Sequence, residues 1–197
     1  MNKVNFNSKI LKRHNEKFKT KKFNNNNTVI KNDYIILLGS LKKSNNEDNI
    51  KIKDSSMRDM NWVESVVKSY KPDVVVLDMG DKFATTQGYA RADEALKACA
   101  VHARQIAKQY DCAMLYMSQL SAEAEGKIIL NQSMMEGSRT GKAAEADLMI
   151  LIAKNPPVEG QDGEDAQRHL NIVKNKLSGW HGNVHCELDY KTARYIA

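Results

Sequence analysis

One short stretch, VVVLD at 74–78, constrains the fold of this chain more than any other part of the sequence. Its four apolar residues do not alternate with polar ones, so they predict a strand buried on both faces, as in a parallel sheet covered by helices. Asp78 then stands at the C-terminal end of that strand. Because ligands bind at this edge of open α/β sheets, a carboxylate there is placed to hold a metal ion or to order a water molecule.

The segments that follow alternate between helical and strand patterns. Apolar residues recur at helical spacing over 60–70 and 91–110. Apolar runs predict strands at 74–78, 112–117, 146–152, 170–173 and 184–190. A hairpin-like connection at 178–183 joins the last two strands. We therefore predict an α/β fold with a largely parallel sheet, flanked by helices, and an antiparallel C-terminal edge.

Charge is distributed unevenly along the 197 residues. Residues 1–53 contain thirteen lysines and arginines against four acids, whereas residues 54–197 carry a small net negative charge. We predict that 1–53 is a basic, Lys- and Asn-rich leader that is mostly disordered apart from a short strand at 34–38, and that 54–197 is the folded domain. The leader is interpreted either as a basic arm that touches nucleic acid or as junction sequence joined to a truncated domain.

The cysteines and the hydropathy of the chain indicate the cellular compartment in which the protein is expected. Three cysteines lack metal-ligand spacing, and no signal peptide or long apolar segment is recognisable. We expect a reduced, cytoplasmic protein without membrane association, which would be in the bacterial host cytoplasm if the sequence comes from a phage.

Four stretches, taken in order, resemble the second half of the RecA-like ATPase domain of DnaB-like ring helicases, including phage primase-helicases. They are VVVLD at 74–78, YMSQL at 116–120, GSRTGKAAEADLMILI at 137–152 and HLNIVKNKLSG at 169–179. The same layout overlaps with strand-exchange recombinases of the RecA-like class. Long filaments on DNA would indicate the recombinase, and closed rings of about six subunits the helicase.

The resemblance implies roles for two strand-end residues. Asp78 resembles the Walker B aspartate, which holds Mg²⁺ at the ATP phosphates. Gln119 resembles the glutamine that contacts the γ-phosphate and passes its presence to the DNA-binding loop, since a side-chain amide both donates and accepts hydrogen bonds. Simpler readings are a strand-end cap for Asp78 and a backbone contact for Gln119. Asp81 is interpreted either as an assistant to Asp78 or, more simply, as an exposed loop acid.

The resemblance also implies a role for the lysine pair Lys174 and Lys176, which would reach a neighbouring subunit's ATP site. The family typically has an arginine at the second position, and a lysine lacks the planar fork that grips phosphate oxygens. An ordinary solvated pair is the alternative. Side chains two residues apart along a strand point to the same face, so both lysines are predicted to lie on one face.

The loops after the first two predicted strands are where the family grips single-stranded DNA. Cations and an amide in these loops would follow the phosphate backbone, with sequence-independent and salt-sensitive binding. The candidate DNA-binding residues are Lys82, Arg91, Lys127, Asn131, Arg139 and Lys142.

A phosphate-cradling GxxxxGK[ST] motif is missing from the sequence, and Gly141-Lys142 does not supply it because Ala143 follows. We therefore expect a truncated helicase ATPase domain that needs ATP and Mg²⁺ but is inactive alone, and whether the chain is itself an enzyme stays open. The expected partners are single-stranded DNA and either a homo-oligomeric ring or a complementary fragment with the missing motif. The alternatives are a non-catalytic DNA-binding or ring-assembly module and a recombinase fragment.

Overall fold

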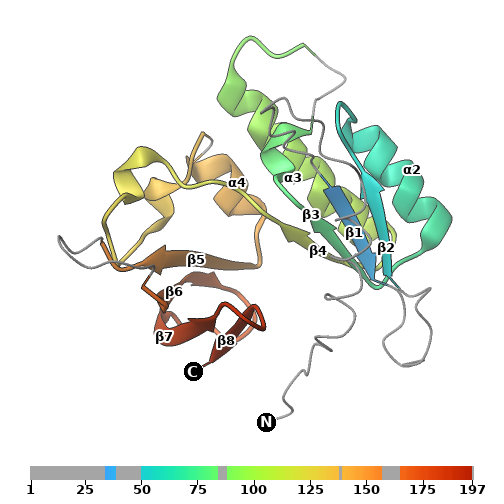
Figure 1. The fold of residues 1–197 in the computed structure, drawn as a ribbon. Coiled ribbons are helices and arrows are strands. Elements are labelled where there is room, and N and C mark those ends of the chain that lie inside the picture. Colours follow the sequence, from blue (N-terminus) through green and yellow to red (C-terminus); the bar gives the residue numbers. More distant parts are fainter. Residues whose placement is uncertain (1–33, 39–49, 84–87, 138, 157–164, 197) are drawn as a thin grey trace, which may run out of the picture. The chain divides into compact units, whose positions relative to one another are not determined.

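The computed structural model describes residues 34–38, 50–83, 88–137, 139–156 and 165–196. Their strands form two four-stranded sheets, with strand orders β2-β1-β3-β4 and β5-β6-β7-β8. Helices lie between successive strands from β2 to β5 along the chain (Figure 1). The predicted α/β fold class is confirmed, but the strands divide between two sheets instead of forming one.

The first sheet contains the strand on which the sequence prediction rests. Its members are β1 (Tyr34–Leu38), β2 (Ile50–Asp54), β3 (Val74–Leu77) and β4 (Ala113–Tyr116). β3 and β4 are parallel, with Val74 opposite Ala113 and Leu77 opposite Tyr116. β1 runs antiparallel to both β2 and β3. The parallel sheet that was predicted is therefore one parallel pair among the described strands.

The predicted leader overlaps this sheet. The strand predicted at 34–38 is confirmed as β1, whereas β2 was not predicted and runs across the proposed boundary at residue 53. Residues 1–33 and 39–49 lie outside the described residues, so the boundary and the disorder of the leader stay predictions.

Two helices pack with β3 around the first hydrophobic core. α2 (Met60–Tyr70) begins where the Asp59 carboxylate accepts a hydrogen bond from the Trp62 amide, and it ends at Lys71 in the left-handed conformation. α3 (Ala92–Gln109) follows the long apolar stripe predicted at 91–110. The core is made by buried side chains of these elements, including Val63, Val67, Val75, Leu77, Cys99 and Ile106.

The second sheet is a run of antiparallel strands with its own core. Its members are β5 (Leu148–Lys154), β6 (Gln167–Asn175), β7 (Gly182–Asp189) and β8 (Arg194–Ile196), so the antiparallel C-terminal edge is confirmed. The short 3-10 helices η3 (Ala122–Ala124) and η4 (Gln132–Met134) and the helix α4 (Arg139–Glu145) precede it. Leu130, Met134, Met149 and Leu151 are among the buried residues of this second core.

The edge strands β4 and β5 each have exposed side chains on one face. In β4 the Leu115 side chain is exposed, and in β5 exposed residues alternate with buried ones along the whole strand. The apolar runs were read correctly as strands. Each of them pairs on one side only among the described strands.

Candidate functional site

The strand-end residues Asp78 and Gln119 leave the first sheet at the same edge. Asp78 directly follows β3 and Gln119 lies three residues beyond the end of β4, and the two strands are parallel neighbours. The Met117 amide donates to the Leu77 carbonyl over 3.1 Å, and the Gly80 amide donates to the Met117 carbonyl over 2.8 Å. The backbone therefore continues to pair past both strands and sets the two strand ends side by side.

The turn that carries Asp78 is sterically constrained. Asp78 is half-buried, and Met79 adopts a left-handed conformation with φ of 57°. Such a backbone costs energy in a residue other than glycine and persists only where the surroundings enforce it. Gly80, the first residue of the 3-10 helix η2 (Gly80–Lys82), packs so closely on the Tyr116 ring that an added Cβ would lie 2.6 Å from its Cζ atom. Asp78 thus has a rigid base.

Asp81 lies at the centre of a buried polar network. Its two carboxylate oxygens accept hydrogen bonds from Lys142 Nζ at 3.1 and 2.9 Å, and they also accept from the Tyr116 and Ser118 hydroxyls. Lys142 Nζ donates to Ser118 Oγ over 2.8 Å as well. The side chains of Lys142 and Asp81 are only 3% and 15% exposed. The interpretation of Asp81 as an exposed loop acid was therefore wrong.

The same network changes the interpretation of Lys142. Its ammonium group is buried and already makes three hydrogen bonds within the chain, so in this structure it is not placed to contact a DNA phosphate. Instead Lys142 joins α4 to the strand-end edge, because Ser118 directly precedes Gln119 and Asp81 follows Asp78 by three residues. A buried, fully bonded lysine holds these elements together.

Burial also shifts the pKa values of two groups beside this network. Desolvation, helped by the charge of Asp81, raises the pKa of the Cys99 thiol to about 11. The same causes, together with the charge of Cys99 and the hydrogen bond to Asp81, raise the pKa of Tyr116 well above its usual value. Both groups are therefore protonated near neutral pH, and the Tyr116 hydroxyl acts as a hydrogen-bond donor to Asp81.

The lysine pair lies at the junction of α4 and β5. Lys174 Nζ donates to the carbonyl oxygens of Ala143 and Ala144, and Lys176 Nζ donates to Asp147 Oδ1 over 3.4 Å. Burial, with a contribution from the positive charge of Lys176, lowers the pKa of Lys174. Both side chains point to this junction, as the period-two spacing predicts, although Lys176 lies just beyond the end of β6.

Arg104 on α3 joins this junction and was missed by the sequence analysis. Its guanidinium donates to the Glu145 carbonyl and, over 3.0 Å, to Asp147 Oδ1. The hydrogen bond from Arg104 is the main reason why the pKa of Asp147 is lowered. Arg104 lies on the polar border of an amphipathic helix, where an arginine is ordinary, so its sequence position carries no signal.

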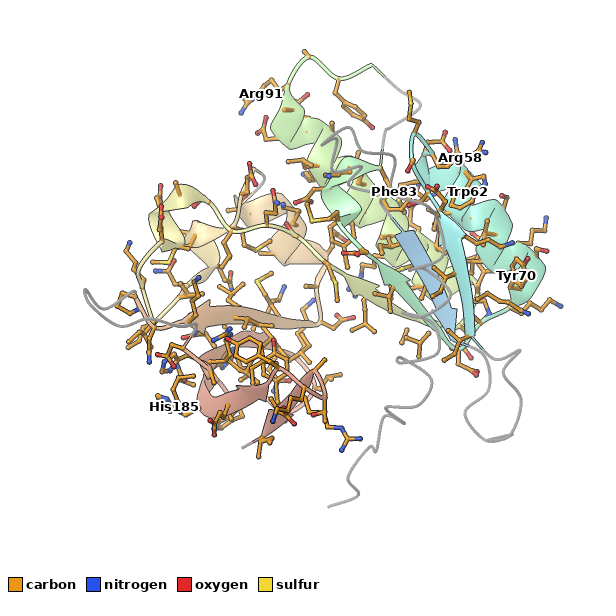
Figure 2. All side chains as sticks on the ribbon, in the orientation of Figure 1. Arg58, Trp62, Tyr70, Phe83, Arg91 and His185 are labelled. Carbon is orange, nitrogen blue, oxygen red and sulfur yellow. The ribbon has the colours of Figure 1, made fainter. Side chains whose placement is uncertain are left out.

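The remaining DNA-binding candidates differ in their surroundings. Lys82 and Lys127 are exposed. Arg91, at the start of α3 in Figure 2, forms a bidentate pair with Asp93 at 2.9 and 2.8 Å, which offsets its charge. Asn131 caps η4 by accepting from the Ser133 amide and hydroxyl. Arg139 is the first residue of α4. Residues 84–87 of the first predicted loop lie outside the described residues.

A buried asparagine attaches the second candidate loop to the second sheet. Asn171 Oδ1 accepts from the Leu130 amide over 3.2 Å, and its Nδ2 donates to the Ile128 carbonyl over 3.0 Å. Gln132 Nε2 donates to the Val173 carbonyl, also over 3.0 Å. Asn171 is buried although β6 carries several polar residues and the apolar Leu170 and Ile172 flank it, so its sequence position did not mark it as buried.

The resemblance implies Mg²⁺ and ATP at the edge where β3 and β4 end. Among the described residues, no group of three or more His, Cys, Asp or Glu side chains is arranged to hold a metal ion. Asp81 is bonded to a buried ammonium group, which leaves Asp78 as the carboxylate at this edge. Without a phosphate-cradling motif in the sequence, these residues do not form a complete Mg²⁺-nucleotide site.

Comparisons with known proteins place the fold. The sequence matches no protein-family model and no curated protein. The structure is similar to a solved ATPase domain, with a TM-score of 0.61 and 15% identity over 71% of this chain and 51% of that chain. It is also similar to a DnaB-like replicative helicase, solved in a study of its interactions with primase, with a TM-score of 0.60 and 14% identity over 73% of this chain and 36% of that one.

These matches are to the fold, and they confirm the predicted partial RecA-like α/β architecture. The chain spans about half and about a third of the two solved chains, so both contain elements with no counterpart in it. No helix among the described residues is long and apolar enough to cross a membrane.

Proposed function

We propose that this chain is part of an ATP-driven motor that translocates on single-stranded DNA, of the DnaB-like helicase type, and that it is inactive without a phosphate-binding element from elsewhere. The observation that carries the proposal is the paired end of β3 and β4, with Asp78 directly after β3 and Gln119 three residues beyond β4. The similarity in fold to an ATPase domain and to a DnaB-like replicative helicase supports the same assignment.

The roles of the edge residues follow from their chemistry. In a completed site, Asp78 would be the carboxylate that holds Mg²⁺, and the ion would supply positive charge at the phosphates of ATP. Gln119 is exposed, and its amide is able to contact a terminal phosphate. Lys142, Ser118 and Asp81 keep the two strand ends in a fixed relation, so the completed site is preorganised.

We assign the two lysines of the pair different roles. Lys176 is 48% exposed and makes one long hydrogen bond, so it is the member able to reach a neighbouring subunit in a ring. Lys174 is held by the last carbonyls of α4 and positions that helix. Because a lysine offers a single charge in place of a bidentate fork, we expect Lys176 to contribute modestly to phosphate contact.

DNA contacts are assigned to the exposed cations of the two loops, Lys82 and Lys127, with Arg139 at the start of α4. Lys142 is left out because it is buried. The second loop is attached to β6 by Asn171 and Gln132, so Lys127 projects from a loop with a fixed base. Such contacts go to phosphates and predict binding that weakens steeply with salt.

Steady-state ATP hydrolysis tests the proposal. We expect negligible turnover by the purified 197-residue chain with Mg²⁺ and single-stranded DNA, and no change in the Asp78→Ala variant. Substantial turnover by the chain alone that disappears in Asp78→Ala would contradict the proposal, because it would require a phosphate-binding element within this sequence.

A second candidate function is a non-catalytic module that binds single-stranded DNA. The exposed Lys127 on an attached loop, in a sequence without a phosphate-binding motif, favours it. This candidate predicts salt-dependent binding without nucleotide that weakens in Lys127→Gln, whereas Lys154→Gln, which removes an exposed lysine of β5, serves as the matched control. Binding that requires both ATP and a second polypeptide with a phosphate-binding loop favours the motor instead.

A further inference from the structure

Two histidines lie against each other across neighbouring strands of the second sheet. His169 of β6 is directly opposite His185 of β7, and their ring centroids are 4.6 Å apart. Side chains that are directly opposite in an antiparallel pair point to the same face of the sheet. The two imidazoles therefore form one cluster on that face, and His185 is labelled on β7 in Figure 2.

Hydrogen bonds fix the tautomer of the His169 ring. Its Nε2 atom lies 2.8 Å from Asn155 Oδ1, and Asn155 Nδ2 donates to the Asp165 carboxylate over 2.7 Å. Because the amide nitrogen of Asn155 is used on that carboxylate, its oxygen faces the ring and accepts a hydrogen bond from Nε2–H. Burial, with a contribution from His185, lowers the pKa of His169, so the ring is neutral near pH 7. In a neutral ring with the proton on Nε2, the Nδ1 atom carries a lone pair.

This Nδ1 atom is buried and has no hydrogen-bond partner. His169 is only 5% exposed, and its Nδ1 makes no hydrogen bond within the part of the chain that the structure describes. The same holds for Oδ1 of Asn183, which lies two residues before His185 on β7 and therefore on the same face. Both atoms are acceptors, and burying an acceptor without a partner costs free energy. The face therefore has the chemistry to receive a cation or a hydrogen-bond donor.

The surroundings of His169 are those of a metal ligand. A histidine that binds a metal usually donates its other ring N–H to an oxygen that fixes its tautomer, as Asn155 does here. Imidazole nitrogen is a common ligand of Zn²⁺, Cu²⁺ and Ni²⁺. Cys186 does not take part, because its Sγ contacts the Arg168 carbonyl and neighbouring residues of a strand point to opposite faces.

The separation of the rings also fits one shared ion. Two imidazoles at about 2.0–2.1 Å from one ion, with an angle of about 90–110° between the two bonds, have centroids about 4.5–5.2 Å apart. The observed 4.6 Å lies within this range, so the strands already hold the rings at the required separation. The rings now stand edge to face at 82°, and His185 is exposed, so its side chain is able to turn a nitrogen toward Nδ1 of His169.

We propose that His169 and His185 bind one divalent transition-metal ion, such as Zn²⁺, which links β6 to β7. Nδ1 of His169 and one ring nitrogen of His185 are the two protein ligands, and water completes the coordination. Through Asn155, which directly follows β5, the ion also connects the end of β5 to the pair. The inference is independent of the proposed function, because both histidines lie outside the edge where β3 and β4 end.

Titration of the full chain with Zn²⁺, followed by nitrogen NMR of the histidine rings, tests this proposal. We expect one Zn²⁺ per chain, with a shift of the His169 Nδ1 resonance and of one ring nitrogen of His185, and no shift in the His102 ring. The urea midpoint should rise with Zn²⁺, because a ligand that binds only the folded chain stabilises it. His185→Gln should weaken binding at least about tenfold and abolish this rise.

Matched controls separate this pair from the other histidines of the chain. His14→Gln and His181→Gln each remove one histidine outside the pair and should leave the affinity for Zn²⁺ unchanged. His185 is exposed, so His185→Gln should fold normally, which circular dichroism verifies. His169→Gln is the second test of the pair, and its result counts only if the same measurement shows a folded chain.

Three results would overturn the proposal. The first is no saturable binding of Zn²⁺ below about 1 mM, which would assign the Nδ1 lone pair of His169 to a buried water molecule. The second is a His185→Gln variant that binds Zn²⁺ as tightly as the original chain. The third is a loss of binding in His14→Gln or His181→Gln, which would place the ion at other histidines.

Discussion

Replacing either member of the Asp81–Lys142 pair tests whether this buried network fixes the strand-end edge. Lys142→Met removes the ammonium and keeps most of the side-chain volume, whereas Asp81→Asn removes the negative charge. Breaking a buried ion pair by removing one partner costs about 3–5 kcal/mol, because the remaining charge is left buried without compensation. The side chains of Lys142 and Asp81 are 3% and 15% exposed, so the pair is buried and that free-energy cost applies to it.

The structure also predicts which of the two replacements lowers the free energy of unfolding more. After Lys142→Met, the Asp81 carboxylate still accepts from the Tyr116 and Ser118 hydroxyls. After Asp81→Asn, the Lys142 ammonium keeps only Ser118 Oγ and the new amide oxygen as acceptors. We therefore expect a loss of about 3 kcal/mol for Lys142→Met and closer to about 5 kcal/mol for Asp81→Asn.

Urea unfolding followed by circular dichroism measures both free energies. The double variant should lose less than the sum of the two single losses, because no charge is then left uncompensated. Lys176→Met is the matched control: its pair with Asp147 is about half exposed, so it should cost no more than about 1 kcal/mol. Losses below about 1 kcal/mol for both single variants, or strict additivity, would refute the assignment of a buried, coupled pair.

Three further perturbations have definite expected outcomes. Asn171→Ala should lower the free energy of unfolding by about 2–4 kcal/mol, because the Leu130 amide and the Ile128 carbonyl each lose a hydrogen bond to the Asn171 side chain. Proteolysis within 121–135 should also become faster, since the loop loses this attachment. Gly80→Ala should cost about 1–3 kcal/mol in urea unfolding, since its Cβ would meet the Tyr116 ring at 2.6 Å. Burial raises the pKa of Cys99 from 9.0 to about 11, so the folded state holds this proton more tightly; the associated stability is complete below pH 9 and is lost as the pH rises towards 11. Cys99→Ala should therefore flatten the decline of the urea midpoint between pH 9 and pH 11, and an unchanged slope would contradict this.

Much of the local structure was predictable because its causes are local. The helix at 60–70 has an apolar stripe and a capping Asp59, and VVVL at 74–77 is a strand by composition. That Asp78 and Gln119 follow strands that end at the same edge was also within reach of the sequence, since parallel strands end at a common edge.

The features that were missed depend on contacts between distant parts of the chain. Lys142 looked like a loop cation because its partner Asp81 lies sixty-one residues earlier, and no local pattern indicates that pairing. The division into two sheets was missed for a similar reason. An apolar run such as 148–153 predicts a strand, but it does not tell which strand lies beside it.

The central claim is that the edge formed by Asp78 and Gln119 belongs to a nucleotide site that this chain does not complete by itself. Equilibrium binding of a fluorescent ATP analogue with Mg²⁺ tests this most directly, on the chain alone and on the chain mixed with a polypeptide that carries a GxxxxGK[ST] phosphate-binding loop. We predict no saturable binding by the chain alone, and Mg²⁺-dependent binding by the mixture that is lost in Asp78→Asn. Saturable, Asp78-dependent binding by the chain alone would contradict the account, as would binding by the mixture that is indifferent to Asp78.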